Sequence, residues 1–73
     1  MKNKFKTFIL DITWQTEKFQ VECSQNQETG QYAGCVKKDH HHVITVFSGF
    51  RQLELNVKDV VDFALTSLRE LDS

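Results

Sequence analysis

The pattern of apolar positions changes along the chain, and its last third has the clearest period. Between Val57 and Leu71 the apolar residues follow one another at spacings of one and three: Val57, Val60, Val61, Ala64, Leu65, Leu68 and Leu71. This is the 3.6-residue period of an amphipathic helix. Asn56 precedes it as a suitable N-cap, and Asp59 lies in the first turn, where a carboxylate favours the helix dipole. The pattern predicts a helix over residues 57–71.

Upstream of this segment, apolar and polar residues alternate with the two-residue period of β-strands. Four strands are predicted, over residues 5–14, 18–23, 31–37 and 42–47. The first is apolar on both faces, with Phe8, Leu10, Ile12 and Trp14 on one of them. The segment 24–30 contains no apolar residue and ends in Gly30, which predicts a hairpin loop.

Residues 50–55 fit two interpretations. Leu53 and Leu55 alternate with polar neighbours, so the segment is either a short fifth strand, which we favour, or an extended lead into the helix. Together the elements predict an α+β fold in which an antiparallel, meander-like sheet of four to five strands is packed by one C-terminal helix. A chain of 73 residues has room for one domain, so we predict a single domain over residues 1–73.

Two cysteines and three consecutive histidines are the candidates for metal or redox chemistry. A hairpin centred on residue 29 would place Cys23 opposite Cys35, at a Cα separation of about 5 Å that permits a disulfide. We favour reduced thiols, because no export signal precedes the strands. A metal-stabilised domain that also uses His40, His41 and His42 is a second alternative, although the spacing matches no known zinc module. We therefore expect no metal and no cofactor.

The net charge of −1 limits the classes of partner. A nucleic-acid-binding domain usually has a strong basic excess, which this chain lacks. The first alternative function is nonetheless a single-stranded nucleic-acid-binding protein, in which Phe5 and Tyr32 stack on bases. Its lysines would be Lys2, Lys4, Lys6, Lys37 and Lys38. We disfavour this alternative on charge.

The N-terminal region resembles a signal peptide only superficially. The apolar run Phe8–Leu10 ends at Asp11, so it is too short for the apolar core of an export signal, and no segment is long enough to span a membrane. We expect a cytoplasmic protein with no membrane partner. Either cysteine with a histidine, or Asp11 alone, could serve an enzyme, but no spacing links them, so we predict a non-enzymatic protein.

Phe63 is the one large apolar residue outside the helix stripe. It lies about 130° from the centre of the stripe, beside Val60 and Ser67. One interpretation is that Phe63, Val60 and Ser67 contact a partner, since exposed aromatic residues mark interaction sites. The other is that residues 48–53 cover Phe63 within the chain, or that Phe63 is a single exposed apolar residue with no special role. We weigh the two equally.

These observations predict a small protein-binding module that acts by occupying the surface of an unidentified protein partner. Small chains of this kind include phage- and mobile-element-type inhibitors and regulators of host machinery, and we extend that expectation to this chain. A domain of this size buries only about 60% of its unfolded surface, so a second subunit would add needed burial. The thin core, the two-sided first strand and Phe63 therefore predict a homodimer.

Overall fold

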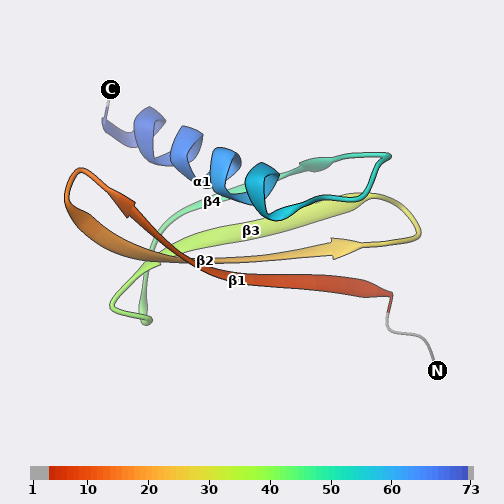
Figure 1. Cartoon of the computed structure of the whole chain (residues 1–73), viewed down its shortest axis with the longest axis horizontal. Coiled ribbons are helices and arrows are strands. Elements are labelled where there is room, and N and C mark those ends of the chain that lie inside the picture. Colours follow the sequence, from red (N-terminus) through yellow and green to blue (C-terminus); the bar gives the residue numbers. More distant parts are fainter. Residues whose placement is uncertain (1–3, 73) are drawn as a thin grey trace.

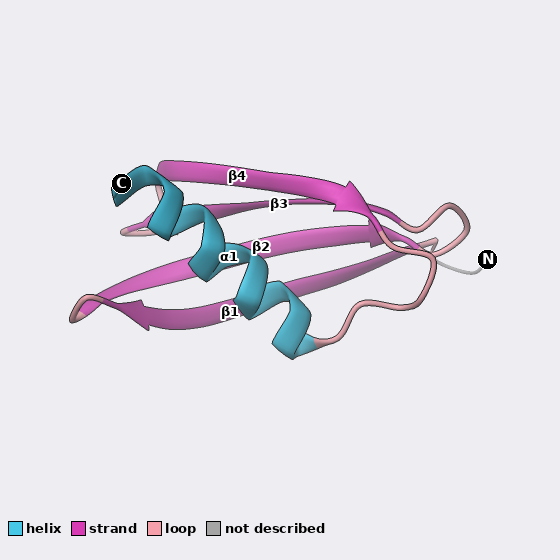
Figure 2. Cartoon of the chain, turned by 90° about the horizontal axis from the view of Figure 1, so that it is seen from above, coloured by secondary structure: helices cyan, strands magenta, loops and turns pink. Residues whose placement is uncertain are grey.

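The computed structural model describes residues 4–72 and contains one sheet and one helix. The elements in chain order are β1 (Phe5–Trp14), β2 (Glu17–Asn26), β3 (Gln31–Lys38), β4 (His42–Phe50) and α1 (Val57–Asp72). The strands form an antiparallel meander in the order β1-β2-β3-β4, and α1 crosses one face of it (Figures 1 and 2). The predicted α+β meander with a C-terminal helix is confirmed, with four strands.

The core lies between α1 and the face of the sheet that α1 covers, which we call the inner face. Its buried apolar residues are Phe8, Ile12, Phe19, Val21, Cys23, Val36, Leu55, Val60, Ala64 and Leu68. Within each strand, the buried apolar residues occupy alternate positions, so they all point to the one face that the alternation predicts. The helix contributes three residues of its stripe at spacings of four, which places them on one side of the helix.

The preferred fifth strand is absent, because β4 continues past Ser48 and Gly49 to Phe50 and no strand lies between residues 51 and 56. Gly49 does not break the strand. It pairs with Tyr32, and a Cβ at Gly49 would lie 2.4 Å from the Tyr32 hydroxyl, so the glycine makes room for the ring. Leu53 is exposed while Leu55 is buried, so the two leucines do not share an environment.

The β2–β3 hairpin is one residue out of the predicted register. β2 continues to Asn26, whose side-chain oxygen accepts the N–H groups of Glu28 and Thr29 and closes the turn early. Cys23 then pairs with Gly34 rather than Cys35. A slip of one residue moves a side chain to the other face of the sheet. The prediction that the cysteines lie opposite each other is therefore wrong, and both are free thiols.

Gln25 is a buried polar residue that belongs to the predicted loop but lies within β2. Only 2% of its surface is exposed, and its Oε1 accepts the Leu55 N–H at 3.0 Å. Its Nε2 donates to the Gly30 carbonyl at 3.4 Å. Gln25 thus connects the β2–β3 turn to the segment that leads into α1.

The start of α1 carries the predicted cap. Asn56 Oδ1 accepts the Asp59 N–H at 2.9 Å, and the Asp59 carboxylate accepts the Asn56 N–H at 3.3 Å. These reciprocal bonds form a capping box that satisfies two N–H groups at the helix end. Arg51 adds an ion pair to the same carboxylate. The prediction of Asn56 as N-cap is confirmed.

This cap predicts an acid-dependent loss of stability. The Arg51 hydrogen bond, aided by the Asn56 backbone N–H, holds the pKa of Asp59 below its ordinary value of 3.8. Because the folded-state pKa is lower than that of the unfolded chain, Asp59 stabilises the fold above pH 3.8, and the contribution is lost as pH falls through the folded-state pKa. We expect wild type to have a higher urea midpoint than Asp59→Asn at neutral pH, with the difference shrinking in acid. An equal difference at both pH values would contradict this.

Candidate functional site

The sheet has a second face, on the side opposite α1, that no element of residues 4–72 covers (Figure 1). We call it the outer face. It carries the row Ile9, Glu22, Cys35 and Val46, which lie side by side in register, and every second residue along each strand from that row. The exception is the start of β4, where a bulge opposite Val36 and Lys37 shifts the alternation and places Val43, the partner of Lys37, on the outer face. An antiparallel sheet with one covered face normally exposes polar residues on the other. The composition of this outer face therefore bears directly on function.

Large apolar side chains are concentrated on the outer face, and all of them come from the two edge strands. Their exposed fractions are 53% for Phe5, 62% for Ile9, 48% for Val43, 69% for Val46 and 60% for Phe50. Single exposed apolar residues are common on protein surfaces, but a group on one face marks an interaction site. The outer face is therefore the leading candidate for the functional surface.

A row of small residues crosses the outer face between larger ones. Thr7, Ser24, Ala33 and Ser48 lie in register across all four strands. Above them a shallow hollow of about 680 Å³ is bounded by Phe5 and Phe50. A second hollow of about 380 Å³ shares Ser24 and Ala33 with it and extends toward Ile9. We call the two hollows together the outer trough, and it has room for side chains from a partner.

The charges on the strands of the outer face balance one another. Two lysines, Lys18 and Lys37, accompany two acids, Asp11 and Glu22, so the net charge is zero. Lys37 Nζ lies 3.0 Å from Glu22 Oε2, and this hydrogen bond raises the pKa of Lys37. The face therefore has the character of a neutral, partly apolar surface.

The residues of the nucleic-acid alternative do not form a basic groove. Four of its lysines pair with glutamates: Lys4 with Glu28, Lys6 with Glu54, Lys37 with Glu22 and Lys38 with Glu17. Lys2 lies outside the described residues. Phe5 is on the outer face, whereas Tyr32 packs against the core on the inner face. The structure therefore does not bring the two aromatic residues together as a stacking platform.

The predicted contact residues of α1 have different environments. Val60 has no exposed surface, so its predicted place in a contact surface is wrong. Phe63 stacks on Tyr32, with ring centres 4.9 Å apart and planes within 7°, and it also packs against Phe47. Side chains of β3 and β4, not the segment after β4, therefore form its main contacts within the chain. Phe63 and Ser67 remain partly exposed.

Phe63 and Ser67 border a groove between α1 and β4. Thr66 and Glu70 line it from the helix, and Val46 and Ser48 line it from the strand, around a volume of about 300 Å³. We call this the edge groove, because β4 is an edge strand of the sheet. The interface prediction for Phe63 and Ser67 thus stays a prediction, and the groove is the place where they could meet a partner.

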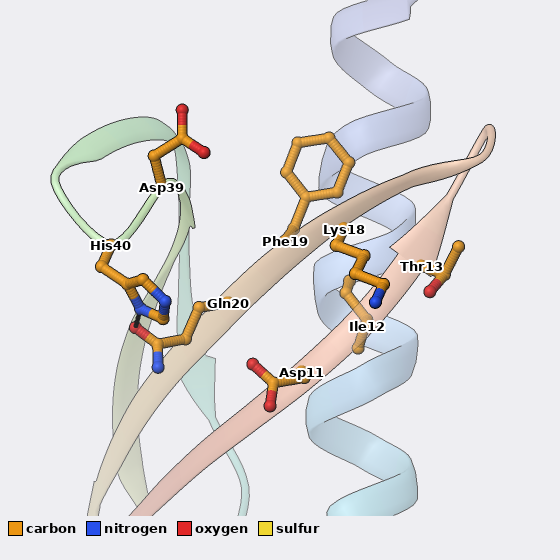
Figure 3. Close-up of a pocket in the computed structure, with 8 residues that line it drawn as sticks. All are labelled: Asp11, Ile12, Thr13, Lys18, Phe19, Gln20, Asp39 and His40. Atoms are coloured by element: carbon orange, nitrogen blue, oxygen red, sulfur yellow. Dashed lines mark hydrogen bonds between the residues drawn. The ribbon is translucent and has the colours of Figure 1, made fainter.

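A polar hollow of about 440 Å³ lies near the β3–β4 turn (Figure 3). Asp39 and His40 both have positive φ, as in a two-residue hairpin turn, and this bend places His40 Nδ1 3.0 Å from Gln20 Oε1. The side chain of Asp39 points away from Asp11 in Figure 3. The hollow therefore presents hydrogen-bonding groups, with no pair of acidic groups aimed at a common point.

The structure separates the two cysteines of the metal-stabilised alternative. Cys23 is buried on the inner face, where burial raises the pKa of its thiol, while Cys35 lies on the outer face. The two sulfur atoms therefore cannot join one site with the histidines. Within residues 4–72, no three His, Cys, Asp or Glu side chains are grouped as metal ligands would be.

Within the described part of the chain, no helix has the length and apolar character required to cross a lipid bilayer. No protein-family model, curated protein or solved structure matches the chain.

Proposed function

We propose that the chain is a small non-enzymatic protein-binding module that binds a partner protein through the outer face. The observation that carries the proposal is the group of five large apolar side chains on a face without net charge. Covering such side chains is favourable by roughly 25 cal/mol per Å² of apolar surface removed from water. Because no element of residues 4–72 covers them, that free energy is available for binding.

The partner surface that fits the outer face is neutral and apolar, with at least one side chain that protrudes into the outer trough. A face of four strands, each about 30 Å long and about 4.8 Å from the next, covers roughly 600 Å² in projection. A standard protein interface buries about 800 Å² per partner, so one outer face is close to sufficient. The paired lysines support a protein partner over a nucleic acid, since nucleic-acid affinity depends on free cationic groups.

The proposed mode of action is occupation of a partner's surface, as in an inhibitor, adaptor or regulator. The chain offers a rigid sheet face, which loses little conformational entropy on binding. The proposal also includes self-association into a homodimer. A dimer would present the outer face twice and would raise the apparent affinity for a partner with repeated sites.

The test uses outer-face variants and a matched control. Wild type, the double variant Phe5→Ser/Phe50→Ser and the control Leu53→Ser would each be used to isolate partners from host lysate. Leu53 is 72% exposed but lies after β4, in the segment between Arg51 and Leu55 that hydrogen-bonds to Gln25 on the inner face. We expect one protein to be retained by wild type and by Leu53→Ser, and its affinity for the double variant to fall about 10- to 100-fold.

Two results would contradict the proposal. The first is a purified partner that binds the double variant as tightly as wild type. The second is tight binding of a single-stranded oligothymidylate with steep salt dependence, which would favour the nucleic-acid alternative. Circular dichroism of each variant checks that the fold is retained.

A further inference from the structure

The two edges of the sheet differ in how they are protected. Beyond β1, the segment of residues 51–56 and the start of α1 extend past the strand, whereas no element within residues 4–72 lies beyond β4 (Figure 2). Lys6 of β1 pairs with Glu54 of that segment. β1 also carries Asp11, while β4 contains no Asp, Glu, Lys or Arg from His42 to Phe50. Edge strands are normally guarded by charges, by covering elements or by bulges, and β4 has only the bulge opposite Val36 and Lys37, so β4 is the less guarded edge.

Apolar surface lies on both sides of the β4 edge. Val46, the most exposed apolar residue of the strand at 69%, projects from the outer face. On the inner side the edge groove holds partly exposed Phe63 and Ser67 of α1. A strand that paired with β4 would therefore contact Val46 on one side and α1 on the other. This arrangement makes the β4 edge and the edge groove one continuous surface.

We propose that this surface binds a second copy of the chain, with the two β4 strands paired antiparallel about a two-fold axis. The inference rests on the homodimer of the proposed function and adds its site. A strand without charged residues can pair with itself without bringing like charges together. Pairing of β4 with the β1 of another copy would instead leave free edges and continue into a filament. Antiparallel self-pairing closes after two copies.

The geometry of the dimer follows from this pairing. Its two-fold axis is perpendicular to the sheet, so the eight strands form one continuous sheet. Both outer faces then lie on the same side, and both α1 helices lie on the other, where their Phe63 flanks approach across the edge grooves. A nine-residue strand provides an edge of about 30 Å, which is small for a stable dimer even with the helix contacts. We therefore expect a dissociation constant in the micromolar range.

The test compares a lysine substitution at each end of the outer-face row that runs from β1 to β4. Ile9 of β1 and Val46 of β4 both belong to the outer face, and their exposed fractions are 62% and 69%. In sedimentation experiments we expect wild type and Ile9→Lys to show the same monomer–dimer equilibrium. Val46→Lys places a charge at the two-fold contact, and we expect it to weaken the dimer at least about 10-fold.

Three other outcomes would overturn the inference. A wild type that stays monomeric at several hundred micromolar excludes the dimer. Equal loss of the dimer in both variants places the contact on the outer face, and loss in neither variant places it away from β4. Both substitutions lie on the outer face, so both are expected to weaken partner binding, while only Val46→Lys affects the dimer. Failure of the dimer and failure of the proposed function are thus separate results.

Hydrogen exchange of the unaltered protein provides a second measurement that does not depend on a variant. Pairing at the β4 edge protects backbone N–H groups of β4 that otherwise face water. We expect these amides to exchange more slowly as protein concentration rises through the dissociation constant, with no such change in β1. Concentration-dependent protection in β1, or none in either strand, would overturn the pairing.

Discussion

Replacing Gly34 with alanine is expected to destabilise the protein by about 2–3 kcal/mol, a large share of what a domain of this size has. A Cβ at this position would lie 2.5 Å from the Phe47 ring and 2.7 Å from the Glu22 backbone oxygen. The ring could shift only by disturbing its packing against Tyr32 and Phe63. The backbone oxygen belongs to the neighbouring strand, so it could not move without disturbing the sheet.

Urea unfolding followed by circular dichroism measures this effect. The matched control is Ala33→Val, which adds atoms at the adjacent residue on the exposed outer face. We expect this control to stay within about 0.5 kcal/mol of wild type. If Gly34→Ala had the midpoint of wild type, the close packing of the aromatic cluster over Gly34 would be refuted.

Replacing Gln25 with alanine is expected to cost about 2–3 kcal/mol as well. The change removes the side-chain oxygen that accepts the Leu55 N–H, and Leu55 is only 1% exposed. A buried N–H without a hydrogen-bond partner costs about 1–3 kcal/mol. It also leaves a cavity beneath the segment that precedes α1. Because that segment positions the capped start of α1, we expect the loss to appear as a lower midpoint for the whole fold.

Two comparison variants separate the causes. Gln25→Met retains the volume and removes the hydrogen bonds. We therefore expect it to lose at least about half as much free energy of unfolding as Gln25→Ala does. Gln31→Ala truncates an exposed glutamine on the next strand, and we expect almost no change. If Gln25→Met were as stable as wild type, the hydrogen bonds of Gln25 would contribute nothing to folding.

Several elements were predictable because they depend on neighbours in the chain. The helix follows from its 3.6-residue stripe, and its start follows from Asn56, whose side chain bonds only three residues ahead. The bounds of the first strand also agree with the structure. The buried apolar residues of β1, Phe8 and Ile12, both belong to the strand face that the alternation predicts to be apolar.

The errors share a different cause, which is pairing between distant segments. The register of β2 and β3 depends on where Asn26 closes the turn, and one residue of slip separates Cys23 from Cys35. The burial of Gln25 depends on Leu55, thirty residues away. A polar side chain is buried only when such a partner exists, and local sequence does not show the partner.

The candidate site illustrates both kinds of information. The apolar residues of β1 are visible in the sequence on both faces of the strand, so the sequence by itself determined that β1 has apolar surface to bury on each side. It also determined that the chain has one helix, which can cover only one face of a sheet. Only the tertiary structure decided which face α1 covers, that Val60 is buried and that Val46 and Phe50 are exposed. The reason is physical: alternation assigns side chains to two faces, but burial depends on what packs against each face.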